Sequence, residues 1–572
     1  MMKKFKKIAG LMLALVIALA MGVTALAADT NSYTITIENE TSGYTYTAYQ
    51  IFKGDLSDGI LSNVEFGSAL SATDQADLLK YYSSTTNNIL DGTNYEKSAA
   101  GLAAALADGK ITASDFAEKV ATYSLTSAGT FTYDSSEKEY NLTVTGAGYY
   151  LIKNTAVPEK DGAYTNYILK VVGNVSVEPK AAVPSSDKTV ADINDSTDAS
   201  AATSTNDSAD YDIGDNVPFT LTATMPTNYG DYDTYKLTFH DELSSGLSFN
   251  SSSVVVTVTT GTTTTTVDSG YTLAIKGDST NPTTDDCSFE VIIADTNALY
   301  DDQGDAISVT AGSVITVTYT AELLTNAGYK ETNTMHIVYS NNPNSTTDTG
   351  TSTTDLTTVF TYTLTLDKTD SSGNPLEGAV FTLYKYVGVG VQGADANGYI
   401  SVAEVSAGYQ VVSITEFTSG VTYYTYNDNT QEYTEVTDTS GAPDSGTTYY
   451  VKNTFTFAGL DDGQYKLVET TTPSGYNTMT DLVFYIVAAH DENGITSLKV
   501  TSDSAGQNEI TGYTENTSNG TITATIVNYK GSELPSTGGI GTTIFYIVGT
   551  LLILLAAVLL ITRSRMRRSE EK

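Results

Sequence analysis

Few side chains in this sequence are suited to enzymatic chemistry. The three histidines, His240, His336 and His490, lie far apart in the chain and offer little for a zinc site or a His-based catalytic dyad. Cys287 is the single cysteine, which excludes an intramolecular disulfide framework. No motif of paired carboxylates indicates a glycosidase. We therefore expect no bound metal, no cofactor and no enzymatic active site, which leaves amines, amides and carboxyl groups as the reactive groups.

Three such groups fall at the start, the middle and the end of residues 361–530. Lys368 lies in the opening segment, Glu469 lies in the segment YKLVETTTPSGY, and Asn528 lies in the closing segment IVNYK. These segments closely resemble those of collagen-adhesin B-type domains of wall-anchored proteins. In that family a lysine on the first strand bonds covalently to an asparagine on the last strand, and a glutamate acts as catalyst. The resemblance implies a Lys368–Asn528 isopeptide bond promoted by Glu469.

The chemistry of such a bond is self-consistent. An apolar site favours the neutral amine over the ammonium and the neutral acid over the carboxylate. The free amine can then attack the side-chain carbonyl of Asn528, while protonated Glu469 donates to that oxygen and ammonia leaves. Because the fold holds the reactants together, one slow turnover is enough and no substrate pocket is needed. The alternative is an ordinary Lys–Glu ion pair at the rim of a sheet.

Residues 181–360 contain a second set of this kind. They include DKTV around Lys188, FHDELSSGL around Asp241 and NTMHIVYSNNP, which begins at Asn333. These segments resemble the second domain of pilus shaft subunits, in which a Lys–Asn bond forms with an aspartate as catalyst. Lys188 and Asp241 fit the family's positions, and we choose Asn333 as the asparagine, with Asn341 and Asn342 as rivals. A turn-capping carboxylate is the alternative role for Asp241.

A third reactive segment precedes a long apolar run near the C-terminus. Residues 542–562 read TTIFYIVGTLLILLAAVLLIT, which is long enough to span a membrane, and the basic tail 563–572 should stay cytoplasmic. The pentapeptide LPSTG at 534–538 precedes this run. The pentapeptide, the apolar run and the basic tail together resemble the sorting signal of Gram-positive wall proteins, on which the enzyme sortase acts. The resemblance implies that a sortase thiolate attacks the Thr537 carbonyl, releases Gly538 onward and passes the acyl group to an amine. The pentapeptide consists of Leu534, Pro535, Ser536, Thr537 and Gly538.

An acceptor amine is suggested by residues 171–180, which read VVGNVSVEPK. This segment partly resembles the pilin motif WxxxVxVYPK, whose lysine is the family's polymerisation nucleophile. The two later valines, the proline and Lys180 match, whereas Val171 stands in place of the tryptophan and Glu178 in place of the tyrosine. The resemblance implies that Lys180 of one subunit attacks the acyl group on Thr537 of another. An ordinary solvated lysine is the alternative, and residues 28–180 show no convincing Lys–acid–Asn set of their own.

The elements that position these groups are predicted to be β-strands. Segments such as SVVVTV and ITVTY are rich in β-branched and aromatic residues, and several alternate polar and apolar positions. Only residues 71–79 and 98–120 are typical of helices, with Ser and Thr cap signals. Polar segments at 185–210 and 341–355 suggest boundaries, although the first could be a loop within the second domain. We expect an all-β protein of tandem immunoglobulin-like or collagen-adhesin-type sandwiches over 28–180, 181–360 and 361–530.

The N-terminus and the overall charge indicate the compartment. Four lysines, an apolar run and Ala25-Leu26-Ala27 predict a signal peptide over 1–27 that is cleaved after Ala27, with a retained anchor as the alternative. Residues 28–537 contain 20 basic side chains, every one a lysine, and 65 acidic ones, which gives a net charge of −45. A surface this acidic repels phosphate backbones, so we expect no nucleic-acid partner.

Together these features identify the chain as a member of the sortase-assembled backbone pilins of Gram-positive bacteria. The resemblance implies a secreted structural subunit, attached covalently to the cell wall, whose only catalysis is the formation of its own isopeptide bonds. Its implied partners are sortases of the pilus and housekeeping types, identical subunits and peptidoglycan, while minor tip or base pilins and host ligands stay open. The alternative function is that of a wall-anchored adhesin that binds a host ligand and never polymerises, which would need no acceptor lysine.

Overall fold

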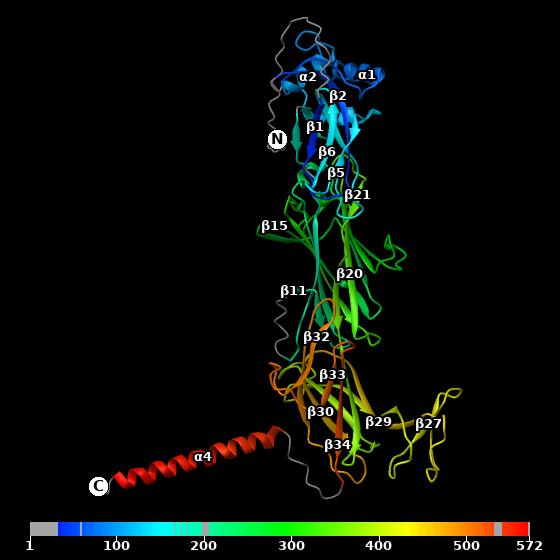
Figure 1. Cartoon of the computed structure of the whole chain (residues 1–572), viewed down its shortest axis with the longest axis vertical. Coiled ribbons are helices and arrows are strands. Elements are labelled where there is room, and N and C mark those ends of the chain that lie inside the picture. The colour runs from blue at the N-terminus through cyan, green and yellow to red at the C-terminus, as the bar shows by residue number, and fades with distance from the viewer. Residues whose placement is uncertain are drawn as a thin grey trace.

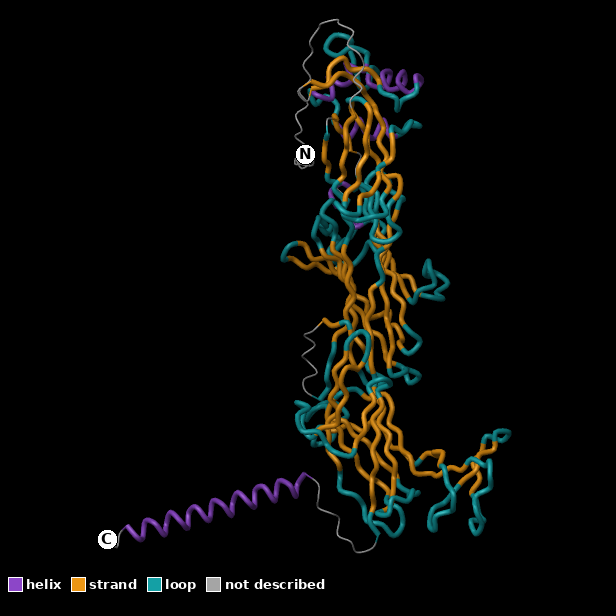
Figure 2. Tube along the Cα trace, viewed as in Figure 1, coloured by secondary structure: helices purple, strands orange, loops and turns teal. Residues whose placement is uncertain are grey.

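The computed structural model describes residues 32–57, 60–165, 168–172, 174–179, 181–196, 205–530 and 540–569. Three strand-rich domains follow one another along a rod (Figure 1), and the short helices gather in the first of them (Figure 2). The prediction of an all-β chain with a few helices near the N-terminus is therefore confirmed. The predicted cleavage site at Ala27, the acceptor Lys180 and the pentapeptide 534–538 lie outside the described residues.

The first domain contains two sheets and three helices. Its sheets have the strand orders β5-β6-β1-β9 and β3-β2-β7-β8, with β4 also paired to β2. The helices begin at the capping residues Ser71, Ser98 and Thr112, whose side chains accept hydrogen bonds from backbone amides of the first turn. The elements are β1 (Ser32–Ile37), β2 (Thr45–Ser57), β3 (Ile60–Phe66), α1 (Ala72–Tyr82), α2 (Ala99–Ala107), α3 (Ala113–Ala121), β4 (Gly129–Thr130), β5 (Thr132–Asp134), β6 (Glu139–Thr145), β7 (Gly148–Ala156), β8 (Ile168–Val172) and β9 (Val175–Val177).

The second domain is a sandwich of two sheets. One sheet has the order β11-β10-β13-β19-β15-β16 and the other β12-β22-β20-β14-β18-β17, with β21 on β20. Strand β19 alternates buried and more exposed residues, as its sequence pattern predicts, so one face of the strand lines the core. The elements are β10 (Ser185–Ala191), β11 (Thr205–Asn206), β12 (Ser208–Asp210), β13 (Asn216–Thr224), β14 (Leu237–Leu243), β15 (Leu247–Thr260), β16 (Thr263–Thr266), β17 (Thr272–Ile275), β18 (Phe289–Ile293), β19 (Val314–Leu323), β20 (Lys330–Ser340), β21 (Thr349–Thr351) and β22 (Asp355–Phe360), with short 3-10 turns at Tyr229–Asp231 and Thr296–Ala298.

The third domain repeats the sandwich plan. Its sheets have the orders β28-β27-β29-β23-β34-β33, with β26 on β29, and β25-β24-β30-β31-β32. Its first and last long strands, β23 and β34, are adjacent and parallel. The elements are β23 (Tyr362–Asp370), β24 (Val380–Tyr386), β25 (Tyr399–Ser406), β26 (Gly408–Val412), β27 (Tyr424–Asn427), β28 (Glu432–Glu435), β29 (Tyr449–Leu460), β30 (Gly463–Thr471), β31 (Leu482–His490), β32 (Ile495–Thr501), β33 (Tyr513–Asn516) and β34 (Thr521–Asn528).

Polar contacts join the consecutive domains. At the first junction the amide of Asp161 donates to the Thr351 carbonyl at 2.9 Å, and the Tyr164 amide donates to the Asn341 carbonyl at 2.6 Å. At the second junction the buried Lys385 ammonium pairs with Asp461 of its own domain at 2.6 Å and with Asp195 of the second domain at 3.2 Å. Because a buried ammonium needs its carboxylate partners, this ion pair resists separation of the two domains.

The predicted membrane segment 542–562 lies within helix α4 (Ile540–Ser569). Within the part of the chain that the structure describes, no helix is both long enough and apolar enough to cross a membrane.

Candidate isopeptide sites

The third domain brings Lys368, Glu469 and Asn528 together. Lys368 on β23 lies opposite Ile526 of β34, and Asn528 is two residues further along β34. The side chains of Lys368 and Asn528 therefore both face the core. Glu469 reaches the pair from β30 of the facing sheet. All three residues are buried, with exposed fractions of 0%, 4% and 1% in chain order.

Hydrogen bonds fix the acid and the amide. Asn528 Nδ2 donates to Glu469 Oε1 at 2.7 Å, and the Met479 amide donates to the other carboxyl oxygen at 2.8 Å. Lys368 Nζ donates to the backbone carbonyl of Ile526 at 3.2 Å. Asn528 Oδ1 is buried and has no hydrogen-bond partner among the described residues. This is the atom on which negative charge would develop during attack, so a proton donor is needed there.

Burial also affects the protonation of the Lys368 amine. Desolvation lowers the pKa of Lys368 to about 8, and the nearby Glu469 only partly opposes this shift. With that pKa, roughly a tenth of the Lys368 amine is neutral at pH 7, far more than for a solvated lysine. The site therefore supplies a neutral amine beside an amide carbonyl and a carboxyl group, which are the reactants and the proton carrier of isopeptide formation.

The second domain assembles its set differently, across the two sheets. Lys188 lies on β10 of one sheet, while Asp241 and Asn333 lie on β14 and β20 of the facing sheet. Asn333 is paired with Leu243, so it lies diagonally across from Asp241 on the same face. The exposed fraction is 0% for all three side chains.

A tyrosine that the sequence reasoning missed connects these three residues. The hydroxyl of Tyr319 accepts hydrogen bonds from Lys188 Nζ at 3.1 Å and from Asn333 Nδ2 at 2.6 Å, and donates to Asp241 Oδ1 at 2.9 Å. Lys188 Nζ also contacts the other oxygen of Asp241 directly. The sequence signal was present but weak, since Tyr319 is one of the inward-facing positions of the alternating strand β19.

The electrostatic environment of this set favours its neutral forms. Desolvation lowers the pKa of Lys188 and raises the pKa of Asp241, although the two groups partly counteract this by attracting each other. The ring of Phe219 lies 5.2 Å from Lys188 Nζ and contributes to the apolar surroundings. The Oδ1 atom of Asn333 lacks a hydrogen-bond partner within the described ranges, as does the equivalent atom of Asn528.

The rival asparagines have other partners. Asn341 Nδ2 donates to the Gly162 carbonyl at 3.3 Å and so belongs to the first domain junction, while Asn342 Nδ2 donates to Asp348 at 2.7 Å. The structure thus brings Asn333, and neither rival, to Lys188 and Asp241. Burial of Lys188 in this site also makes it unsuitable as an alternative to Lys180 for joining subunits.

We expect Tyr319→Phe to slow formation of the second-domain bond on the order of 10²-fold, because the hydroxyl that aligns amine, acid and amide is lost. The measurement is the loss of ammonia over time after synthesis, followed by intact mass. Tyr235→Phe is the matched control, since the Tyr235 hydroxyl is buried in the same core but makes no hydrogen bond to any described residue. An equal delay in both variants would show that Tyr319 acts only through packing.

The structure corrects the sequence interpretation of the histidines. His240 and His336 stack on adjacent strands, with ring centroids 4.6 Å apart and planes inclined by 12°, although they are 96 positions apart in the sequence. They are paired residues of β14 and β20, so sheet register overrides their separation in the chain. Only His490 lies elsewhere, at the second domain junction, where its Nδ1 is 2.8 Å from the Ser208 hydroxyl.

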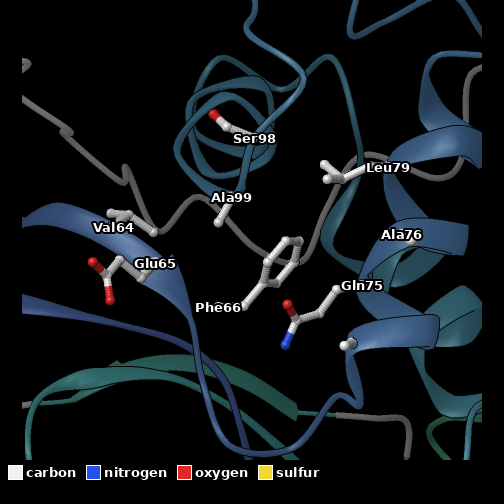
Figure 3. A pocket seen from close by; sticks show the side chains of 9 residues that line it. Val64, Glu65, Phe66, Gln75, Ala76, Leu79, Ser98 and Ala99 are labelled. Carbon is white, nitrogen blue, oxygen red and sulfur yellow. The ribbon is translucent and has the colours of Figure 1, made fainter.

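An open pocket of about 500 Å³ lies beside the helices of the first domain (Figure 3). Its lining includes Phe66, Leu79 and Ala99, and its single carboxylate belongs to Glu65. Glu65 pairs with Lys53 at 3.1 Å on the surface. The pocket therefore offers no pair of carboxylates for glycoside hydrolysis.

Comparisons with known structures return backbone pilins. The T6 backbone pilin of Streptococcus pyogenes is 16% identical with a TM-score of 0.42, and the match covers 90% of this chain and 92% of that one. The major pilin SpaD of Corynebacterium diphtheriae is 17% identical with a TM-score of 0.42, covering 89% and 100%. The major pilin SpaA of the same species is 14% identical with a TM-score of 0.39, covering 87% and 100%. Among curated proteins, none matches this chain.

Two family models match the C-terminal part of the chain. Residues 362–504 match the SpaA prealbumin-like fold domain, which covers most of the third sandwich and includes Lys368 and Glu469. Residues 526–570 match the LPXTG cell wall anchor motif, as the pentapeptide, apolar segment and basic tail predicted. The protein is thus an extracellular, cell-wall-anchored protein in which a prealbumin-like domain of the SpaA kind directly precedes an LPXTG anchor.

Proposed function

We propose that this protein is the backbone subunit of a covalently polymerised cell-surface pilus. The observation that carries the proposal is the recurrence of a buried lysine, acid and asparagine in two successive domains of a wall-anchored rod. A shaft under tension needs domains that do not unfold. This chain has a single cysteine, so no disulfide within the chain can stabilise them. Internal amide bonds would meet that need in both domains.

Each bond forms by transfer of an acyl group within the domain. In the third domain, Lys368 Nζ attacks Cγ of Asn528 while Glu469 protonates the carbonyl oxygen. The Glu469 carboxylate then takes a proton from Lys368 Nζ and passes it to Nδ2 of Asn528. Ammonia leaves, and the carbonyl re-forms as its oxygen returns a proton to Glu469. One N–C bond forms and one breaks, so the domain loses one ammonia and gains an amide. Lys188, Asp241 and Asn333 take the corresponding roles in the second domain, where Tyr319 holds them in line.

The positions of the two bonds suit a load-bearing shaft. In the third domain the bond would join adjacent parallel strands, from Lys368 near the end of β23 to Asn528 at the end of β34, where the chain leaves the sandwich. In the second domain it would join β10 to β20 across the core. Tension would then pass through an amide in each domain, which leaves the intervening strands unloaded, whereas unbonded strands separate at a rate set by the unfolding barrier.

Subunits would be joined by sortase. A sortase thiolate would cleave between Thr537 and Gly538, and the Lys180 amine of the next subunit would accept the Thr537 acyl group, forming an intermolecular amide. The support on the acceptor side is the order of the chain, because β9 of the first domain ends at Val177, β10 of the second begins at Ser185, and Lys180 falls between them in the sequence. A housekeeping sortase would pass the final acyl group to peptidoglycan.

We expect deletion of residues 538–572 to release the protein into the medium as monomer, and Thr537→Ala to leave a monomer with no covalent link to the wall, because no acyl-enzyme can form. Immunoblots of wall extracts and culture medium measure the distribution, and a ladder that resists boiling in detergent marks the polymer. Ser536→Ala is the matched control, because it changes the variable position of the LPXTG motif and should leave the ladder in the wall. A Thr537→Ala protein still bound covalently to the wall would contradict the proposal.

A wall-anchored adhesin that does not polymerise is the second candidate, and one feature favours it. The hairpin of β27 and β28 projects from the side of the third domain (Figure 1) and forms an aromatic cluster with residues of β26 and β29. Tyr409 stacks on Tyr433 with ring centroids 3.7 Å apart, and Tyr426 and Tyr450 pack around them. Tyrosine is enriched where proteins bind partners. Monomer in the wall, without a ladder, would favour this function.

A further inference from the structure

Four metal-ligating side chains of the second domain converge on the outer face of its sheet. His240 on β14 and Glu290 on β18 are paired residues of adjacent strands, and Asp285 and Cys287 lie in the segment that leads into β18. One ligand atom from each residue lies within 4.8 Å of all the others. Since Asp241 faces the core, its neighbour His240 faces outward, so this cluster lies behind the isopeptide site and is separate from it.

Two buried atoms of the cluster lack hydrogen bonds within the described part of the chain: His240 Nδ1 and Glu290 Oε2. His240 is only 7% exposed and Glu290 is fully buried. The His240 Nδ1 atom is 2.9 Å from Asp285 Oδ2 and 3.1 Å from Glu290 Oε1, yet it makes a hydrogen bond to neither. Buried polar groups are normally satisfied, so a ring nitrogen that faces two carboxylates in this way calls for a shared partner.

We propose that His240, Asp285, Cys287 and Glu290 bind a zinc ion. Imidazole nitrogen, thiolate sulfur and carboxylate oxygen together are a donor set for zinc, whereas calcium and magnesium require oxygen donors. Ligand atoms each about 2.0–2.1 Å from one tetrahedral ion lie about 3.3–3.4 Å from one another, so His240 Nδ1 and the two carboxylates would move apart by a few tenths of an ångström to bind it. Binding would displace the thiol proton of Cys287, which now donates to the Phe289 carbonyl at 3.3 Å.

The surroundings already orient the ligands. The Thr284 amide donates to Glu290 Oε1 at 2.8 Å, which fixes the carboxyl group, and the His336 ring stacks on His240 and holds its plane. The Cys287 amide donates to Asp285 Oδ1 at 3.2 Å and leaves Oδ2 toward His240. The ion would fasten residues 276–288 onto the outer face of the sheet, a cross-link that supplements the amide bond inside the domain and forms independently of it.

Cobalt is the sharpest probe, because a thiolate bound to Co²⁺ gives an intense near-ultraviolet charge-transfer band and Cys287 is the only cysteine. The secreted form, residues 28–537, keeps all three domains and is purified with a chelator and titrated with Co²⁺ and then Zn²⁺. We expect one equivalent of Co²⁺ to produce the band and Zn²⁺ to abolish it and to raise the melting temperature. Cys287→Ser should remove the band, and Asp285→Asn should weaken Co²⁺ binding at least about tenfold.

Asp286→Asn is the matched control for Asp285→Asn. Asp286 is the next residue of the same segment, but its side chain is 84% exposed and pairs with Lys276 at 3.2 Å. It should leave the band and the affinity unchanged. His490→Gln controls for the separate group of Asp192, Asp210 and His490, which contains no sulfur and should not affect the band. Absence of the band in the unaltered protein, or equal weakening by both aspartate variants, would overturn the zinc site in favour of an imidazolium paired with two carboxylates.

Discussion

The secreted chain is expected to have an intact mass below its sequence value by two molecules of ammonia. One comes from Lys188 with Asn333 and one from Lys368 with Asn528, because each amide forms with loss of the asparagine side-chain nitrogen. The burial of both sets, the lowered pKa of each lysine and the free carbonyl oxygen of each asparagine make reaction the expected outcome in the folded domain. Mass spectrometry of purified residues 28–537 measures the deficit, and tandem spectra locate the branched peptides.

Variants of the two acids separate the bonds. Glu469→Ala should restore one ammonia, Asp241→Asn should restore the other, and the double variant should restore both. The third-domain bond, between Lys368 and Asn528, closes a loop of about 160 residues. Its absence should lower the free energy of unfolding by about 5 kcal/mol and the melting temperature of the third domain by roughly 10–20 °C. Glu404→Ala is a control on β25 of the same sheet, which β24 separates from the strand of Glu469, and it should keep both bonds. An unaltered protein with the full sequence mass would reject both isopeptide bonds and leave only the wall anchor.

Lys180→Ala is expected to reduce the wall-extract ladder to monomer while leaving folding intact. Without the acceptor amine, the acyl group on Thr537 can be transferred only to the wall, so the monomer should stay covalently anchored. The Thr537→Ala protein, in contrast, should have no covalent link to the wall. Circular dichroism and the two-ammonia mass deficit check that the domains still fold and react.

The matched control for Lys180→Ala is Lys160→Ala. Lys160 is an exposed lysine of the first domain and forms a β-bridge with Thr351 of the second, so its loss removes the same charge as the loss of Lys180. Its ladder should be undiminished. A full ladder in the Lys180→Ala strain would show that another lysine is the acceptor. Lys188 is not a candidate because it is buried between sheets.

Local patterns in the sequence were enough to predict the fold class and the positions of several elements. Alternation of apolar and polar residues predicted strands such as β19. The Ser and Thr caps predicted helix over 71–79 and 98–120, and the structure divides the second range into α2 and α3. The anchor was equally predictable, because its parts are contiguous in the chain. Lys368, Glu469 and Asn528 could be named because each lies in a short recognisable segment, and the structure places all three in one site.

What the sequence could not supply was the identity of neighbours across strands. Alternation shows which side chains share a face, but the choice of Asn333 over Asn341 depends on register, which sets Asn333 against Leu243 and turns Asn341 toward the first domain. Tyr319 joins Lys188, Asp241 and Asn333 only because two sheets pack face to face. His240, His336 and Cys287 meet for the same reason. Sequence by itself determined the strands, the helices and the wall anchor, since these depend on residues close together in the chain. The tertiary structure decided which reactive groups meet, because pairing and packing of strands bring together residues that lie far apart in the chain, such as Lys368 and Asn528, which are 160 positions apart.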